Sequence, residues 1–152
     1  MNEPLLDGVR PSWIAFGWFI SAAVTAVIIF AFLVLGVFGL FRIDGPDEFI
    51  WFAVSIAVGF GVGGYFAGWR AGVHPFLHGI GIGLFSIVVW ILANLLSAVV
   101  FGGWDWDAIP LVATIFLLAL QIVFASLGAW AGANWAHTPP ALRAERGSGK
   151  GG

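Results

Sequence analysis

Four long stretches of the chain contain no Asp, Glu, Lys or Arg and are almost wholly apolar. They cover residues 13–41, 49–69, 76–101 and 108–136. About 20 apolar residues in a helix are enough to cross a hydrocarbon core of about 30 Å. The pattern therefore predicts an all-α, polytopic membrane protein whose four transmembrane helices form a bundle.

Proline and tryptophan positions mark where these helices should begin. Proline is tolerated in the first turn of a helix but is costly in its interior, and Pro11, Pro46, Pro75 and Pro110 each lie at the start of a stretch. We therefore expect no proline kink. Tryptophan favours membrane interfaces, so we expect the first two tryptophans, Trp13 and Trp18, to lie among the headgroups.

Composition supports the membrane assignment and removes several function classes. The chain has 152 residues, of which 61% are hydrophobic and 9% charged, whereas a soluble domain has about 25% charged residues. The net charge of -2 offers no basic surface for nucleic acid. There are no cysteines, so we expect no disulfide, iron–sulfur cluster or thiol nucleophile.

Basic residues predict the orientation, because they are enriched in short cytoplasmic segments. With the N-terminus inside, only Arg42 is external, while the others are cytoplasmic: Arg10, Arg70, Arg143, Arg146 and Lys150. This predicts an inner-membrane protein with a cytoplasmic segment 1–11, a membrane domain 12–136 and a disordered cytoplasmic tail 137–152. Four residues are expected to be interfacial anchors: Trp69, Arg70, Trp104 and Trp106. Arg70 could instead form a salt bridge to a partner.

The two halves of the chain resemble each other at an offset of 64 residues. Among the identities, Pro11 aligns with Pro75, Pro46 with Pro110, Gly64 with Gly128 and Gly68 with Gly132. This predicts a tandem duplication of a two-helix hairpin in which both copies enter the membrane in the same direction. Some transporters contain such parallel repeats; the alternative is a duplication that only completes a four-helix bundle.

Small residues recur at four-residue spacing in the last three predicted helices. In membranes, such rows allow helix backbones to approach closely. The candidate packing residues are Gly59, Gly63, Gly64, Ala67, Gly68, Gly79, Gly83, Gly128 and Gly132. We interpret them as internal packing surfaces; the alternative is that they bind another subunit, a lipid or a pigment.

Two amides are the deepest polar side chains. Asn94 lies in the outer half of the third stretch and Gln121 near the middle of the fourth. Amides in membranes bond across helices for about 0.6–2 kcal/mol, which is the role we expect. The alternative is contact with a solute in a pore.

The chain offers two weak candidates for metal binding. His74 and His78 have the i to i+4 spacing of helical metal or haem ligands, but Pro75 disfavours helical geometry at His74. The predicted outer loops carry Asp44, Asp47, Glu48, Asp105 and Asp107, which could bind a cation or cap helices. We favour interfacial histidines and capping carboxylates, and therefore predict no metal and no cofactor.

One segment resembles a known group of proteins. The run from Gly63 to Ala71, Gly-Gly-Tyr-Phe-Ala-Gly-Trp-Arg-Ala, followed by His78 and Gly79, is similar to a pattern in small four-helix bacterial membrane proteins that are frequent in actinobacteria. In those proteins a basic residue usually occupies the position of Trp69. The likeness covers residues 11–101 and implies a four-helix bacterial membrane protein without implying an activity.

These features together predict a non-enzymatic subunit. Packing surfaces are abundant, while the sequence contains no recognisable nucleophile–base pair, metal cluster or charge inside a span. We expect a structural or accessory role in the lipid bilayer, with a membrane-protein partner or as a homo-oligomer. The alternative is a small homo-oligomeric transporter or channel.

Overall fold

The computed structural model describes residues 9–39, 46–72, 74–101 and 111–137, and nearly all of them are helical. The helices are α1 (Pro11–Val37), α2 (Pro46–Ala71), α3 (Pro75–Phe101) and α4 (Leu111–His137). No strand occurs within these ranges. All four helices are long and apolar enough to cross a membrane. The predicted fold class is confirmed: the chain is a multi-pass membrane protein built as a helical bundle.

The helix boundaries follow the prolines closely. Pro11, Pro46 and Pro75 are the first residues of α1, α2 and α3, because proline lacks the backbone donor that the first turn does not need. The first helix ends at Val37, four residues before the predicted boundary, and Gly39 follows with a φ of 69°. Pro11 and His137, which the sequence placed in the cytoplasmic segment 1–11 and the tail 137–152, are helical. Residues 1–8 and 138–152 lie outside the described residues.

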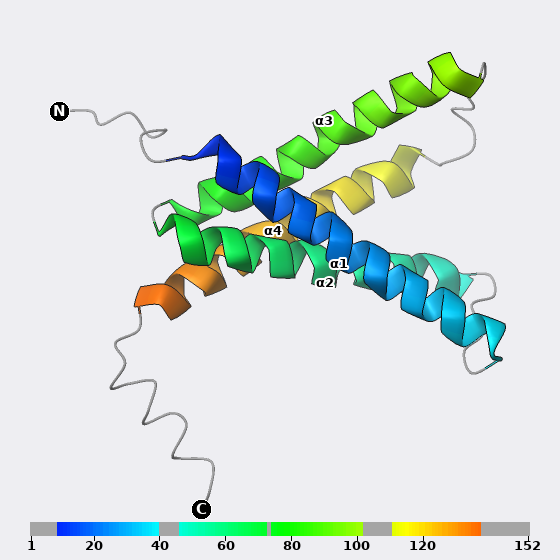
Figure 1. The fold of residues 1–152 in the computed structure, drawn as a ribbon, viewed down its shortest axis with the longest axis horizontal. Helices are drawn as coiled ribbons and strands as arrows, with labels where there is room; N and C mark the ends of the chain where they lie inside the picture. The colour runs from blue at the N-terminus through cyan, green and yellow to red at the C-terminus, as the bar shows by residue number, and fades with distance from the viewer. Residues whose placement is uncertain (1–8, 40–45, 73, 102–110, 138–152) are drawn as a thin grey trace, which may run out of the picture.

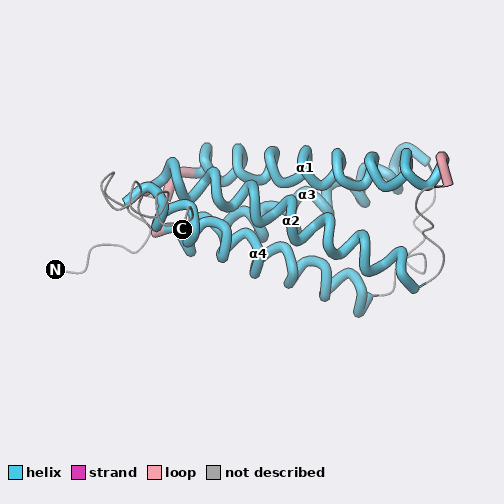
Figure 2. Tube along the Cα trace, turned by 90° about the horizontal axis from the view of Figure 1, so that it is seen from below, coloured by secondary structure: helices cyan, strands magenta, loops and turns pink. Residues whose placement is uncertain are grey.

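The four helices form two layers that are tightly packed at one end and open at the other. Figure 1 shows α1 and α3 converging where both begin and diverging toward their last residues. In Figure 2, α1 and α4 lie on opposite sides of α2, and among the described residues no contact joins α1 to α4. We call the converging end the arginine end, since it carries Arg10 and Arg70, and the other the splayed end.

The centre of the bundle is the parallel pair of α2 and α4, which make the most extensive contact of any two helices. Gly64 and Gly68 face the backbone of Ala125 and Ala129, while Gly128 and Gly132 face the backbone of Gly61 and Tyr65. Each contact of the first set has an equivalent in the second, in which both residues are shifted by 64 positions to the other half of the chain. Reciprocal contacts of this kind occur in two-fold interfaces. This reciprocity supports the predicted duplication.

The seam between α1 and α2 combines glycines with small hydroxyl residues. Side chains at Gly59 or Gly63 would collide with Ser21 and its neighbours on α1, and Thr25 Oγ1 donates to the Ser55 carbonyl across the seam at 3.4 Å. The hydroxyls of Ser21 and Ser55 each donate to the carbonyl one turn earlier in their own helices. Bonding of this kind satisfies a hydroxyl without a partner helix.

The seam between α3 and α4 is built differently. Gly79 faces the backbone of Ser126, and Gly83 faces Ile122. The residues equivalent to Ser21 and Gly59 in the second copy are Phe85 and Val123, so this hairpin cannot repeat the close seam of the first. The two-fold relation therefore holds for α2 and α4 but not for the packing inside each hairpin.

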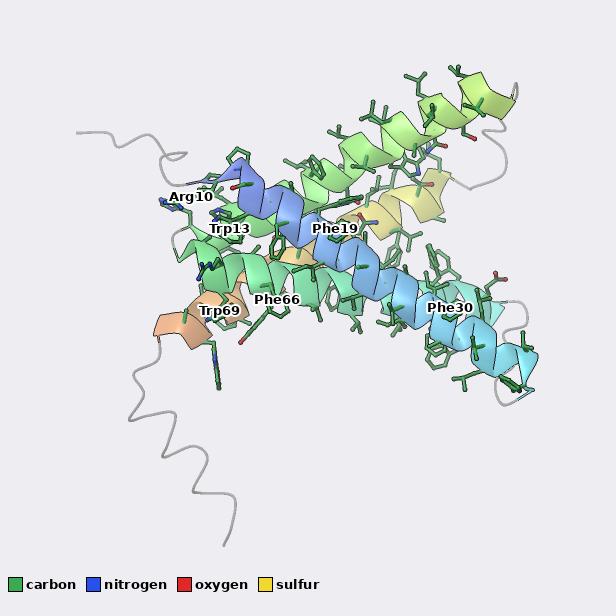
Figure 3. All side chains as sticks on the ribbon, viewed as in Figure 1. Arg10, Trp13, Phe19, Phe30, Phe66 and Trp69 are labelled. Atoms are coloured by element: carbon green, nitrogen blue, oxygen red, sulfur yellow. The ribbon has the colours of Figure 1, made fainter. Side chains whose placement is uncertain are left out.

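The outer surface of the bundle is apolar. Large side chains such as Phe19, Phe30 and Leu96 are more than half exposed, as expected for a surface that faces lipid. Figure 3 shows Phe19 and Phe30 along α1, and Phe66 and Trp69 on α2 toward the arginine end. The buried core is small and includes Ala67, Ile82 and Ala125.

Candidate functional site

The arginine end gathers basic and aromatic side chains from three helices. Arg10 precedes α1, Arg70 lies in the last turn of α2, and His78 lies in the first turns of α3. The Arg70 guanidinium carbon lies 5.6 Å from the centroid of the Trp13 ring, which is within cation–π range. Arg10 and Arg70 are both exposed, and Figure 3 shows Arg10, Trp13 and Trp69 at this end.

His78 links α1 to α3 and is fully buried. Its Nε2 accepts a hydrogen bond from the Arg10 backbone N–H at 3.3 Å, and its Nδ1 lies 3.2 Å from the His74 carbonyl oxygen. A neutral imidazole has one donor and one acceptor, so this geometry requires the proton on Nδ1. Because backbone groups occupy both nitrogens, His78 serves as a structural bridge and is not placed to act as a base.

The spacing of His74 and His78 does not produce a two-histidine helical face. His74 lies before Pro75, outside α3, and its φ of 47° lies in the left-handed region, not in the extended region that residues before proline usually adopt. Its carbonyl oxygen accepts the backbone N–H groups of Leu77 and His78 and so caps α3. Within the described ranges, no three His, Cys, Asp or Glu side chains come close enough to hold a metal ion.

A hollow of about 300 Å³ lies between the helices, is largely open to its surroundings and is lined by residues of all four helices. We call it the interior cavity. Its lining residues are Trp18, Ala22, Thr25, Ala26, Ile29, Phe52, Ile56, Phe60, Ser86 and Gln121. Fully buried Ser21 and Ile82 fill the bundle nearer the arginine end.

Two polar atoms of the cavity-lining residues have no hydrogen-bond partner. Trp18 Nε1 and Gln121 Oε1 are both buried and unpaired. The cross-helix bond expected at Gln121 is therefore not made by its Oε1. The Trp18 ring packs edge-on against Phe85, with the ring centroids 5.6 Å apart. The depth of Trp18 relative to the headgroups stays a prediction.

Asn94 also fails to bond across helices. Its Nδ2 donates to the Trp90 carbonyl in the preceding turn of α3 at 2.8 Å. A short amide side chain can reach this acceptor within its own helix, so it needs no neighbouring helix. Asn94 does not line the interior cavity.

At the splayed end, Asp47 and Glu48 lie in the first turn of α2. Carboxylates there interact favourably with the helix dipole, as the capping interpretation predicts. Glu48 also lines a second cavity of about 220 Å³ between α1 and α2. The other acidic residues proposed for a cation site, Asp44, Asp105 and Asp107, lie outside the described residues, as do the expected anchors Trp104 and Trp106.

A third, wholly apolar hollow separates α2 from α4 toward the splayed end. Its volume is about 340 Å³, and we call it the α2–α4 groove. The helices touch through glycines near the arginine end and are held apart here by Phe49 and Phe116, whose ring centroids are 5.9 Å apart. The lining residues are Phe49, Ile50, Ala53, Val54, Ala57, Phe116, Leu120 and Phe124.

Sequence reasoning found Gln121 but neither the cavity nor the groove. Trp18, Ala22, Ala26 and Ile29 follow one face of α1 at intervals of three or four residues, but an apolar helix shows no polar face that would identify which side is inward.

Comparison of the chain with protein-family models, with curated proteins and with solved structures found no match.

Proposed function

We propose that this protein is a non-enzymatic subunit of the bacterial cytoplasmic membrane that packs against the transmembrane helix of a partner protein. The observation that carries the proposal is the α2–α4 groove. Its eight lining residues are all apolar, and Ala53 and Ala57 are small enough to let another helix backbone come close. The resemblance to small four-helix bacterial proteins supports the bacterial location.

The described polar groups support a non-catalytic role. Ser21 and Ser55 donate to their own helices, and both nitrogens of His78 are occupied by backbone groups. A nucleophile needs a base within hydrogen-bonding distance, and neither serine is paired with a histidine. The hydrogen bonds of His78 and Thr25 instead join neighbouring helices.

The partner proposal predicts a specific effect of filling the groove. We expect Ala57→Phe to reduce the amount of co-purified partner by about tenfold, since a clash in a packed interface costs about 1–3 kcal/mol. Ala23→Phe, on the exposed surface of α1, is the matched control and should leave the amount unchanged. The measurement is the mass and subunit composition of tagged protein extracted from its native membrane in a mild detergent.

A lone monomer in that experiment would contradict the subunit role. A homo-oligomer would favour the second candidate, a small transporter or channel. The observation that favours this candidate is the unpaired Gln121 amide beside a cavity at the centre of the membrane domain. A transport function would require flux by the reconstituted oligomer that falls in Gln121→Leu.

We also propose that the arginine end is cytoplasmic. Basic residues favour the cytoplasmic side, and both Arg10 and Arg70 lie at this end. Because the chain has no cysteine, single-cysteine variants can be labelled without further changes. In intact spheroplasts, a membrane-impermeant maleimide should label Phe38→Cys at once and Val9→Cys only after permeabilisation. The reverse pattern would overturn the orientation.

A further inference from the structure

We propose that the interior cavity binds the hydroxyl end of a lipophilic alcohol, the rest of which extends into the surrounding lipid. This site is separate from the α2–α4 groove, since no residue lines both hollows. The inference does not depend on the subunit role and holds for a monomer or a complex.

The size and lining of the cavity determine the kind of molecule that fits. Its volume of about 300 Å³ is at the lower limit for small-molecule sites, so it accommodates the end of a long molecule. Eight lining residues are apolar or contribute methyl and methylene groups beside Ser86 and Gln121. The occupant must therefore be mostly apolar with a compact polar end.

The two unpaired atoms specify that polar end. The indole N–H of Trp18 can only donate, whereas Gln121 Oε1 can only accept. A hydroxyl group has the complementary functions, because its oxygen can accept a hydrogen bond and its hydrogen can donate one. Buried polar groups in hydrocarbon are costly when unpaired, so an alcohol gains affinity from both bonds, whereas an ether gains one and an alkane none.

Binding requires a small rearrangement of both side chains. Neither Trp18 Nε1 nor Gln121 Oε1 has appreciable accessible surface in the ligand-free structure. The last torsion of a glutamine is broad and has no steep minima, so the Gln121 amide can turn toward the cavity at low cost. The Trp18 ring must tilt against Phe85, with which it makes an edge-on contact.

The test uses purified protein in phosphatidylcholine nanodiscs and three probes of equal chain length. The midpoint of thermal unfolding is followed during titration with 1-dodecanol, dodecyl methyl ether and dodecane. We expect 1-dodecanol to raise the midpoint in a saturable manner, because a ligand that binds only the folded state stabilises it. The ether and the alkane should produce a smaller rise or none.

Two variants assign the effect to the cavity. Gln121→Leu and Trp18→Phe each remove one hydrogen bond while keeping side-chain bulk, and each should weaken the apparent affinity for 1-dodecanol by about tenfold. Asn94→Leu is the matched control, since Asn94 bonds within α3 and lies outside the cavity; its affinity should match the unmodified protein. The unliganded transition of each variant shows whether it is folded.

Three results would overturn the proposal. One is the absence of stabilisation by 1-dodecanol. Another is equal stabilisation by the ether or the alkane, which would show that the hydroxyl proton is not recognised. The third is an unchanged preference for the alcohol in both Gln121→Leu and Trp18→Phe, which would place the binding site elsewhere.

Discussion

Gly68→Val is expected to destabilise the bundle by about 3 kcal/mol or more and to leave little folded protein. A side-chain carbon at position 68 would lie 2.6 Å from the Ala129 Cα and still closer to the Ala129 carbonyl oxygen. A flexible side chain could move aside, but these are backbone atoms of α4. The two helices must therefore separate, and overpacking that displaces a backbone has costs at the upper end of its range.

The control for this prediction lies two turns earlier in the same helix. A side-chain carbon at Gly61 meets no atom within 4 Å. Gly61→Ala should be neutral or stabilising by up to about 1 kcal/mol, because alanine favours the helix over glycine. Thermal unfolding of both variants in detergent, followed by circular dichroism, gives the comparison. Equal stability of Gly68→Val and Gly61→Ala would contradict the close contact of α2 with α4.

His78→Leu is expected to cost about 1–3 kcal/mol and to loosen the start of α1. The substitution keeps the approximate volume of a fully buried side chain but removes the acceptor for the Arg10 N–H. A buried donor left unpaired loses about that much free energy. The damage should be local at first, since the bond joins the first turn of α1 to α3.

Hydrogen exchange distinguishes this local effect from general unfolding. In His78→Leu, the amides of residues 11–17 should exchange faster, while those of residues 61–68 in α2 should remain protected. His74→Asn provides the matched control, because Asn tolerates a positive φ and the His74 side chain is exposed. If exchange at the start of α1 is unchanged in His78→Leu, the hydrogen bond from Arg10 to His78 does not stabilise this part of the helix.

The helix count and starts could be predicted from the sequence because they depend on properties of single segments. Length, hydropathy and the position of a proline each act within one helix, and α1, α2 and α3 begin at the expected prolines. Which helix each row of glycines contacts could not be predicted in this way. Gly63 and Gly64 belong to adjacent rows of α2, and only the folded chain reveals that the first faces α1 and the second α4.

The errors at polar residues share a physical cause. Asn94 was expected to bond across helices, but a carbonyl of its own helix is a nearer acceptor. Gln121 was expected to bond across helices, but its Oε1 has no partner, and the residue lines a cavity. Whether an amide meets a partner on another helix depends on tertiary packing.

The reciprocal contacts of α2 and α4 leave the two halves of the chain free to diverge in sequence elsewhere. In a dimer of identical hairpins, every substitution appears twice, so a glycine that closes one seam must close the other. Here each half mutates alone: Ser21 and Gly59 make one close seam, while Phe85 and Val123 occupy the equivalent positions. When two hairpins are joined in one polypeptide, the α2–α4 contact can stay symmetric while the α1–α2 and α3–α4 seams become different. Residues of the two seams can then change without altering the glycines between α2 and α4.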